Sequence, residues 1–354
     1  MLIRLLVLIV LLAPAGRAQP LPPAADSLAR AFMAQTGAPS LVVAVSRGGL
    51  RTVAGYGEVA GARPDAATRY EIASVTKTFT ALALADAVAR GEVALDTPAQ
   101  ALLPDSVRLA VVNRPVTLGD LITHGSGLPR LPAPFAPASM LDPYADFTEA
   151  DLMRFAASVR PDSAGVRYGY SNAAVGLLGW MLARRDGTTY ADLVARRVLA
   201  PLGLASTSTG GPVAQPYMTS GTAIAAWTFT EASVAAGGLR SSADDLLRYA
   251  EAVARPDERA PTLADAIRLA TAPRFASPGR FRIGLAWHLL PETGPVEVVF
   301  HNGATFGSVA FVGVVPERDL SVVLLSNVGA VREMDALAFG VLRALRAETA
   351  QAEN

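Results

Sequence analysis

Two residues of the segment Glu71-Ile72-Ala73-Ser74-Val75-Thr76-Lys77 could together cleave an ester or an amide. Ser74 carries a hydroxyl that becomes a strong nucleophile when a base removes its proton, and Lys77 follows three positions later. Side chains three positions apart lie on one face of a helix, so the Lys77 amine can reach the Ser74 hydroxyl if a helix begins there. The N–H groups of that helix start would also stabilise an oxyanion.

Lys77 is the only lysine in the chain, beside 30 arginines. Arginine gives a surface the same charge, but its guanidinium stays protonated. A single lysine among arginines is therefore expected where the chemistry needs an amine that can become neutral. Acting as a base would require burial or a nearby cation to lower its pKa. The alternative is that Ser74 caps the helix and Lys77 is a solvated surface cation.

A second candidate element is Tyr170-Ser171-Asn172, directly before an apolar helical stretch. Positions two apart point the same way in an extended segment, so the phenol and the amide can face one cleft. A tyrosine can pass a proton between nucleophile and leaving group, and an asparagine can hydrogen-bond a lysine or a substrate carbonyl. The alternative is that Tyr170 packs in the core while Ser171 or Asn172 caps the helix.

The third element is His301-Asn302-Gly303-Ala304, which we expect at the start of a strand. Glycine lets a ligand come close to the backbone, and a strand edge offers N–H groups for an oxyanion hole. The alternative is that His301 is a surface or capping residue.

In the order SxxK, YxN and HxG, these motifs resemble the family of class C β-lactamases, D-Ala-D-Ala carboxypeptidases, D-aminopeptidases and related esterases. Four further stretches are similar to family segments and extend the resemblance over most of the chain. They are Leu121–Pro129 (LLTHxSGLP), Pro201–Leu204 (PLGM), Ala236–Leu246 (AGGLxSTAxDL) and Gly284–Trp287 (YGLGW).

The resemblance implies a role for each matching residue. Ser74 would be acylated by the substrate, and Lys77 and Tyr170 would share general-base and general-acid duty. Asn172 would help to bind the substrate. The backbone N–H groups of Ser74 and Ala304 would form the oxyanion hole.

The third motif departs from the family pattern, because His301-Asn302-Gly303 stands where typical β-lactamases and carboxypeptidases have Lys-Thr-Gly. His301 and Gly303 would still belong to the substrate-binding strand. The family's lysine helps to hold a substrate carboxylate, whereas a histidine is only partly charged near neutral pH. Family members with histidine there are often esterases or peptidases.

Three functions are therefore compatible with the motifs. The first is an esterase or amidase acting on a small-molecule or peptide substrate. The second is a β-lactamase or D-Ala-D-Ala carboxypeptidase acting on cell-wall peptides. The third is a catalytically idle binding protein with the same fold, which the intact set of Ser74, Lys77 and Tyr170 disfavours.

The remaining sequence predicts strands at both ends of the chain. Asp26–Thr36 has helical spacing, and Leu41–Val45 and Leu50–Val59 form a predicted hairpin around Arg47-Gly48-Gly49. Four β-prone runs and a helix close the chain: Arg282–Leu289, Val296–Phe300, Ser308–Val315, Leu320–Ser326 and the helix Arg332–Glu348.

Helices are predicted between these ends, at Ser74–Arg90, Ala173–Arg185, Tyr190–Leu199 and Ala243–Ala254. We therefore expect an α+β (α/β sandwich) fold of the β-lactamase/transpeptidase type. One antiparallel sheet from both chain ends would be flanked by terminal helices, with a mostly helical lobe inserted. The sheet lobe would cover about 24–65 and 280–350, and the helical lobe about 72–275. Both would form one catalytic domain, 19–354, with the site in a cleft between them.

Composition excludes several kinds of chemistry. The chain has no cysteine and only three scattered histidines, His124, His288 and His301, so we expect neither a metal nor another cofactor. We expect His124 to be structural. The formal net charge is zero, which gives no field that would attract nucleic acid. The sequence does not specify an oligomeric state.

The first eighteen residues, Met1–Ala18, have the pattern of a signal peptide. Arg4 is followed by the apolar stretch Leu5–Leu12, and Gly16-Arg17-Ala18 resembles a cleavage site. The apolar stretch is too short to span a bilayer, although an uncleaved anchor is the alternative. We therefore expect an exported, periplasmic or extracellular protein with no stable membrane span after cleavage.

Overall fold

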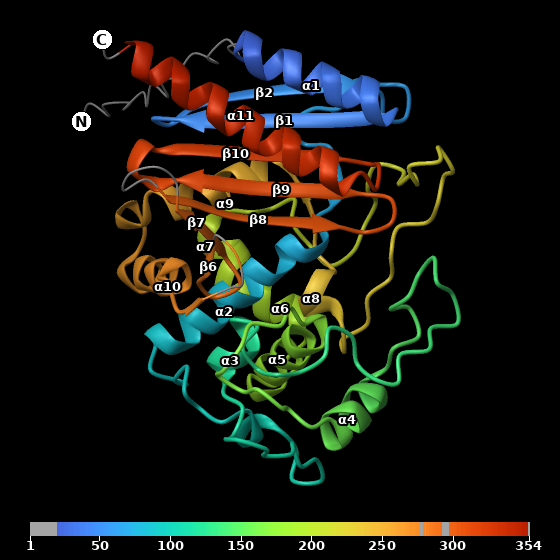
Figure 1. The fold of residues 1–354 in the computed structure, drawn as a ribbon, viewed down its shortest axis with the longest axis vertical. Coiled ribbons are helices and arrows are strands. Elements are labelled where there is room, and N and C mark those ends of the chain that lie inside the picture. Colours follow the sequence, from blue (N-terminus) through green and yellow to red (C-terminus); the bar gives the residue numbers. More distant parts are fainter. Residues whose placement is uncertain (1–19, 277–278, 280, 292–296, 353–354) are drawn as a thin grey trace, which may run out of the picture.

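The computed structural model describes residues 20–276, 279, 281–291 and 297–352, so the predicted signal peptide Met1–Ala18 lies outside the described residues. An eight-stranded antiparallel sheet forms the upper part of Figure 1, in the order β2-β1-β10-β9-β8-β7-β6-β5. Its strands are β1 (Ser40–Arg47), β2 (Leu50–Gly57), β5 (Phe275–Ala276), β6 (Arg282–Ile283), β7 (His288–Pro291), β8 (Glu297–Ala304), β9 (Val309–Val315) and β10 (Leu320–Ser326).

Strands from the two ends of the chain lie side by side in this sheet, because β1, the second strand in its order, pairs with β10, the third, for example Val43 opposite Leu324. Helices α1 (Pro23–Thr36) and α11 (Val331–Ala352) lie together across one face (Figure 1). Side chains of β1 alternate between two cores, with Leu41 and Val43 beneath these helices and Val42 facing the helical part. The antiparallel sheet built from both ends and covered by terminal helices is thus confirmed.

The other face of the sheet meets α9 and the helical part of the chain. Its helices are α2 (Thr76–Ala89), α3 (Leu118–Ile122), α4 (Glu149–Ser158), α5 (Asn172–Arg185), α6 (Tyr190–Val194), α7 (Ala200–Leu202), α8 (Val234–Gly237), α9 (Ala243–Ala254) and α10 (Pro261–Thr271). Helix α2 is central, since every side chain from Thr76 to Ala87 is buried. A Cβ added at Gly179 of α5 would lie 2.0 Å from the Ala235 Cβ atom, so α5 packs directly on α8.

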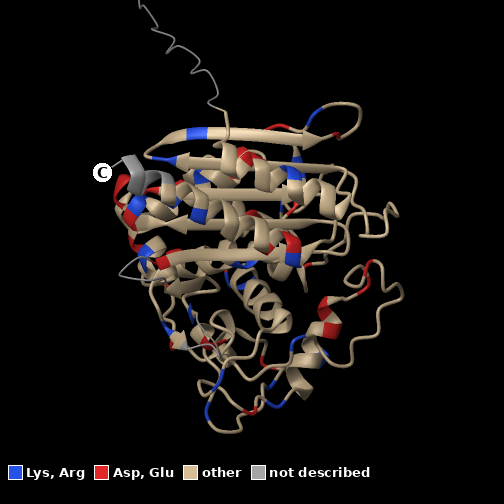
Figure 2. Cartoon of the chain, turned by 45° about the horizontal axis from the view of Figure 1, so that its top comes forward, with Lys and Arg blue, Asp and Glu red and all other residues tan. Residues whose placement is uncertain are grey.

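Shorter elements connect these helices and strands. A two-stranded sheet pairs β3 (Arg69–Glu71) with β4 (Arg240–Ser242). The single turns are η1 (Ala73–Val75), η2 (Ala99–Leu102), η4 (Pro256–Glu258) and η5 (Pro316–Arg318), and the π-helical segment η3 (Ala195–Leu199) joins α6 to α7. Figure 2 shows charged residues of both signs interspersed over the sheet and the helical part. No helix in the described part of the chain combines the length and apolarity needed to cross a membrane.

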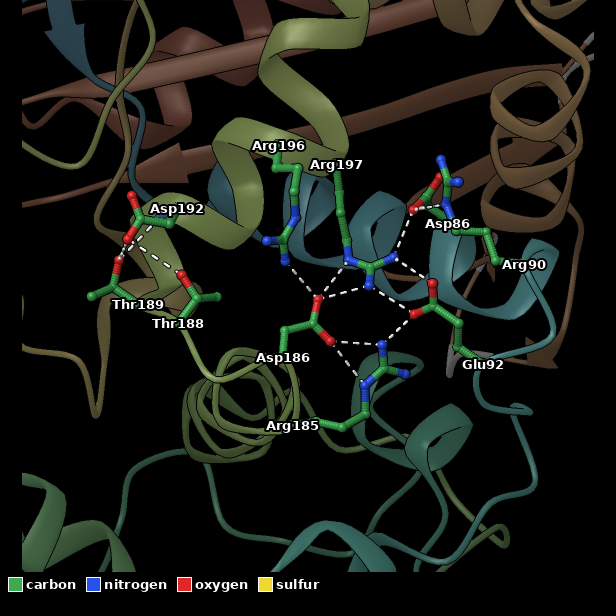
Figure 3. Close-up of polar contacts among 10 residues, drawn as sticks. All are labelled: Asp86, Arg90, Glu92, Arg185, Asp186, Thr188, Thr189, Asp192, Arg196 and Arg197. Atoms are coloured by element: carbon green, nitrogen blue, oxygen red, sulfur yellow. Dashed lines mark hydrogen bonds and ion pairs between the residues drawn. The ribbon is translucent and has the colours of Figure 1, made fainter.

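An ionic network holds the far end of α2 to its neighbours (Figure 3). The guanidinium of Arg197, from η3, lies 2.8 Å from a carboxylate oxygen of Asp86 and 2.7 Å from one of Glu92. It also lies 2.7 Å from Asp186, which follows α5 and is paired with Arg185. The network therefore joins α2, α5 and η3 at one point.

The predicted strand Arg282–Leu289 is wrong in its middle, where β6 and β7 are separated by a turn. The Gly284 N–H donates to Trp287 O at 2.9 Å, and the Leu285 N–H donates to Ala270 O, at the end of α10, at 2.7 Å. A Cβ on Gly284 would lie 2.5 Å from that same oxygen, so only glycine fits there. The backbone N–H groups of this segment thus bond within the turn and to α10 instead of continuing one straight strand.

Candidate active site

Ser74 lies on a tight turn between the small sheet and α2. The prediction that the helix begins at Ser74 needs correction: Ser74 belongs to the 3₁₀ turn η1, α2 starts at Thr76, and Ser74 makes no capping hydrogen bond. Ala73 has a left-handed backbone with φ of 45°, which turns the chain sharply before the serine. Ser74 is partly exposed while its neighbours on both sides are buried, so its hydroxyl is open to a substrate.

Lys77 is fully buried, one turn beyond the serine. Its Nζ atom lies 2.9 Å from Ser74 Oγ and 2.5 Å from the carbonyl oxygen of Ala236. Burial, and then the charge of Arg130, lowers the pKa of Lys77 well below its ordinary value. A neutral amine can donate one N–H to Ala236 O while its lone pair accepts the Ser74 proton. The alternative of a solvated surface lysine is therefore wrong.

Tyr170 completes this group from the segment before α5. Its ring centroid lies 5.0 Å from Lys77 Nζ. Burial raises the pKa of Tyr170, while a hydrogen bond with the Ser74 side chain and the charge of Arg130 oppose that rise. The phenol therefore keeps its proton at neutral pH. Ser171 caps α5, accepting the Ala174 N–H at 2.9 Å, so the capping role falls to the residue between Tyr170 and Asn172.

Asn172 contacts a tyrosine of the long loop before α4. Its Nδ2 donates to the hydroxyl of Tyr144 at 2.9 Å, and the structure shows no hydrogen bond from Asn172 to Lys77. The Oδ1 atom of Asn172 is buried and has no partner among the described residues. An unpaired buried acceptor is costly, so this oxygen is suited to receive an N–H group of a bound molecule.

The third motif forms the last half of β8 (Glu297–Ala304) and not the start of a strand as predicted, and β8 lies directly against the nucleophile turn. A Cβ added to Gly303 would lie 2.3 Å from Ile72 O and 2.8 Å from Ser74 N, so only glycine permits this approach. The Thr305 N–H bonds to Ser308 O, and bonding alternates along an antiparallel pair, so the Ala304 N–H points away from β9. It points to an edge that β7, which pairs only with Glu297–Phe300, leaves free.

His301 is a buried, neutral residue. The alternative that it lies at the surface is therefore wrong, and so is the expectation that it is partly charged near neutral pH. It is 1% exposed, its Nδ1 atom lies 2.5 Å from Asn302 O, and its ring stacks on His288 with centroids 4.9 Å apart. Burial lowers the pKa of His301 well below its ordinary value. His301 therefore supplies no positive charge at the third motif.

His124 lies beneath Tyr170. It is fully buried, its Nδ1 accepts the Ser171 N–H at 3.2 Å, and its ring centroid is 4.4 Å from that of Tyr170. These contacts are consistent with the expectation that His124 has a structural role. In the described part of the chain, no three His, Asp or Glu side chains gather as metal ligands would.

Two further residues of the site were not singled out from the sequence. Glu71 is buried and accepts hydrogen bonds from Trp227 N at 2.7 Å and from Thr305 Oγ1 and Ser308 Oγ, each at 3.1 Å. It thereby ties the nucleophile segment to the turn that follows β8. A charged residue three positions before Ser74, in an otherwise apolar segment, was the available signal.

Arg130 is the second such residue. It follows the Leu121–Pro129 stretch, and its guanidinium carbon lies 4.9 Å from the ring centroid of Tyr170. No sequence pattern marked this residue, because its contact with Tyr170 joins segments 40 positions apart in the chain.

The nucleophile turn, the buried lysine, the phenol and the glycine-lined strand form one arrangement suited to acyl transfer. A sequence model of the Beta-lactamase family matches residues 25–345. The chain belongs to the beta-lactamase family. This beta-lactamase-family chain is therefore a serine hydrolase, and the idle binding alternative is set aside.

Curated relatives of this beta-lactamase-family protein include two from Escherichia coli K12. A beta-lactamase is 28% identical, over 77% of this chain and 79% of the relative. The D-alanyl-D-alanine-carboxypeptidase/endopeptidase AmpH is 25% identical, over 80% of this chain and 78% of the relative. The chain is thus similar along most of its length to proteins with both activities in their names.

Solved structures share the fold. The class C beta-lactamase from Rhodobacter sphaeroides superposes with a TM-score of 0.80 at 24% identity, covering 92% of this chain and 99% of that one. A beta-lactamase/D-alanine carboxypeptidase from Pseudomonas syringae also gives 0.80 at 24% identity, covering 90% and 98%. The expected β-lactamase/transpeptidase-like fold is confirmed.

Proposed function

We propose that this protein hydrolyses an ester or amide bond of a small molecule or peptide through an acyl-enzyme on Ser74. The observation that carries the proposal is the buried Lys77 amine, 2.9 Å from Ser74 Oγ, with its pKa lowered by burial. A neutral amine at hydrogen-bond distance from a hydroxyl is the arrangement that general-base activation of a nucleophile requires.

Acylation begins when Ser74 Oγ attacks the carbonyl carbon of the substrate and its proton passes to Lys77 Nζ. Negative charge develops on the carbonyl oxygen, and the N–H groups of Ser74 and Ala304 are the donors suited to stabilise it. As the carbon–heteroatom bond breaks, Tyr170 gives its proton to the leaving group and recovers one from Lys77. The lysine is then neutral again, and the acyl group remains on Ser74.

Deacylation repeats these transfers with water. A water molecule attacks the acyl carbonyl carbon, loses a proton to the Lys77–Tyr170 pair, and releases the acid as Ser74 Oγ regains a proton. The unpaired Oδ1 of Asn172 is suited to accept an N–H of the substrate during both steps.

The state of His301 favours an ester or amide that does not need the third motif to hold a carboxylate. The third motif of the resembling enzymes holds a substrate carboxylate through a lysine, and here that position carries a buried, neutral histidine. The alternative, a β-lactamase or D-Ala-D-Ala carboxypeptidase, is favoured by the similarity to the Escherichia coli beta-lactamase and AmpH.

The test is parallel turnover of a chromogenic ester, a chromogenic cephalosporin and a D-Ala-D-Ala peptide, with intact mass after a fluorophosphonate. We expect one fluorophosphonate adduct, absent in Ser74→Ala, and the highest kcat/KM for the ester. A cephalosporin or D-Ala-D-Ala peptide turned over faster than the ester would favour the alternative. An adduct that persists in Ser74→Ala would contradict the nucleophile.

We infer that the protein is exported, on the strength of the Met1–Ala18 sequence pattern.

A further inference from the structure

The site contains an exposed cation, Arg130, to which the mechanism above gives no contact with the substrate. Arg130 is exposed, and it makes no ion pair and no side-chain hydrogen bond with any described residue. Its backbone is nevertheless fixed, because its carbonyl oxygen accepts the N–H groups of Asn172 at 2.9 Å and Ala173 at 3.3 Å. The side chain therefore starts from a rigid point at the beginning of α5.

The position of the Arg130 guanidinium is set by Tyr170. Its carbon lies 4.9 Å from the centroid of the tyrosine ring, and Lys77 Nζ lies 5.0 Å from the same centroid. One aromatic ring thus borders both the buried amine of Lys77 and the exposed guanidinium of Arg130. Stacking on a ring orients the planar fork of an arginine and leaves its N–H groups free to bind a planar anion.

The leaving group is the part of the substrate that meets this cation. In the proposed mechanism Tyr170 donates its proton to the departing oxygen or nitrogen, so that atom lies beside the phenol. A group attached to the departing atom can therefore extend along the Tyr170 ring. Arg130 lies against the same ring and has no carboxylate partner among the described residues. His301 cannot compete for an anion, since it is 1% exposed and its Nδ1 is already bonded to Asn302 O.

We propose that Arg130 binds a carboxylate on the leaving-group portion of the substrate and so determines specificity. The substrate class is an ester or amide whose departing alcohol, phenol or amine carries an acid group. This inference rests on the proposed function and adds the identity of the group beyond the scissile bond. Arginine is the side chain best matched to a carboxylate, because its parallel N–H groups bind both oxygens.

The experiment compares 3-acetoxybenzoate with 3-acetoxybenzamide, two esters that differ in the charge of the leaving group. Rates are measured for wild type, Arg130→Gln, Arg130→Lys and Arg30→Gln. For each protein the pH is chosen on the plateau of its pH–rate profile, where activity no longer changes with pH. Arg30 lies on α1, across the sheet from the site, so Arg30→Gln removes the same charge elsewhere. We expect Arg130→Gln to raise KM for the benzoate about 10- to 100-fold, the range of a charge-assisted hydrogen bond.

Any effect of Arg130→Gln on the pKa of Lys77 acts on both esters alike, so the ratio of the benzoate KM to the benzamide KM isolates carboxylate binding. This ratio should rise about 10- to 100-fold in Arg130→Gln, and Arg130→Lys should recover part of the benzoate affinity. Equal loss of kcat on both esters with an unchanged KM ratio would overturn the inference, because Arg130 would then act only on the pKa values of Lys77 and Tyr170. Equal KM values of wild type for the two esters would overturn it too. Wild type that hydrolyses neither ester would instead contradict the proposed function, and this inference with it.

Discussion

The Nζ atom of Lys77 lies 2.9 Å from the Oγ atom of Ser74, and the carbonyl oxygen of Ala236 fixes the amine from the other side. Two elements hold this geometry. Helix α2 carries the lysine inside the core, and η1 lifts the serine to the surface one turn earlier. The distance is therefore a property of packed backbone rather than of two freely rotating side chains.

The pH profile should show a base with a lowered pKa. Lys77 acts in its neutral form, and burial followed by the charge of Arg130 lowers its pKa in the folded protein. The value of kcat/KM should therefore rise with pH and become level well below about 10.4, the ordinary lysine value. Arg130→Gln removes one cause and should move this rise to higher pH. A wild-type profile that still climbs through pH 10 would contradict a neutral Lys77.

Gly303→Ala should damage catalysis more than stability. The added methyl group would meet Ile72 O and Ser74 N at 2.3 and 2.8 Å, so β8 or η1 must shift. Misplacement of reacting groups by about 1 Å can cost roughly 100-fold in rate. We expect kcat/KM to fall by at least that factor. The control is Gly210→Ala, where nothing lies within 4 Å of the new methyl group. Equal kcat/KM values of Gly303→Ala and Gly210→Ala would show that the close contact between β8 and η1 does not determine the geometry of the active site.

Arg197→Met should destabilise the protein by about 3–5 kcal/mol, the usual cost of removing one partner from a buried ionic group. Asp86 and Asp186 are nearly buried and would lose their main cation. Urea unfolding at pH 7 measures the loss. Arg196→Met is the matched control, because Arg196 is 57% exposed and pairs only with Asp186, so its loss should stay below about 1 kcal/mol. If the loss of unfolding free energy in Arg197→Met were as small as that expected for Arg196→Met, the network would not be stabilising.

The same network predicts sensitivity to acid. Burial opposes ionisation of Asp186, but hydrogen bonds from Arg197 and Arg185 outweigh it and lower its pKa in the folded protein. A carboxyl group with a lowered folded-state pKa stabilises the fold above its unfolded pKa and loses that effect as pH falls through the folded one. The stability difference between wild type and Arg197→Met should therefore shrink below about pH 4. A difference that stays constant to pH 2 would contradict this assignment.

The local part of the site could be predicted from the sequence because it depends on spacing alone. Ser74 and Lys77 are three positions apart, and Tyr170 and Asn172 flank a helix cap, so both pairs are fixed by one turn of backbone. The antiparallel sheet from both ends also followed from β-prone runs bounded by turns. The distance between residues two or three positions apart depends on the local backbone and not on how the rest of the chain folds.

Other features depend on contacts between distant segments. The charge of His301 is decided by burial against His288, which no local pattern reveals. Arg130 reaches Tyr170 only after the chain folds. The run Arg282–Leu289 is predicted as one strand because its residues favour strands, yet its middle forms a turn in which the Leu285 N–H bonds to Ala270 O at the end of α10. Tertiary contacts override propensity in such places.

Export can be checked at the N-terminus of the protein recovered from outside the cytoplasm. We expect it to begin at Gln19 or within a few residues of it, because Gly16-Arg17-Ala18 resembles a cleavage site. Intact mass or N-terminal sequencing gives the answer. Retention of Met1 in the exported protein would refute cleavage.

The most direct test of the account is the acylation rate of Lys77→Arg, measured beside a thermal melt. Arginine is also a long basic side chain, but its guanidinium stays protonated where Lys77 acts as a neutral amine, so it cannot accept the Ser74 proton. We expect acylation to slow by at least the roughly 10²–10⁴-fold that a general base contributes, while a variant that still melts cooperatively shows that the fold is kept. Acylation within about threefold of wild type, worth well under 1.4 kcal/mol, would show that Lys77 is not the base.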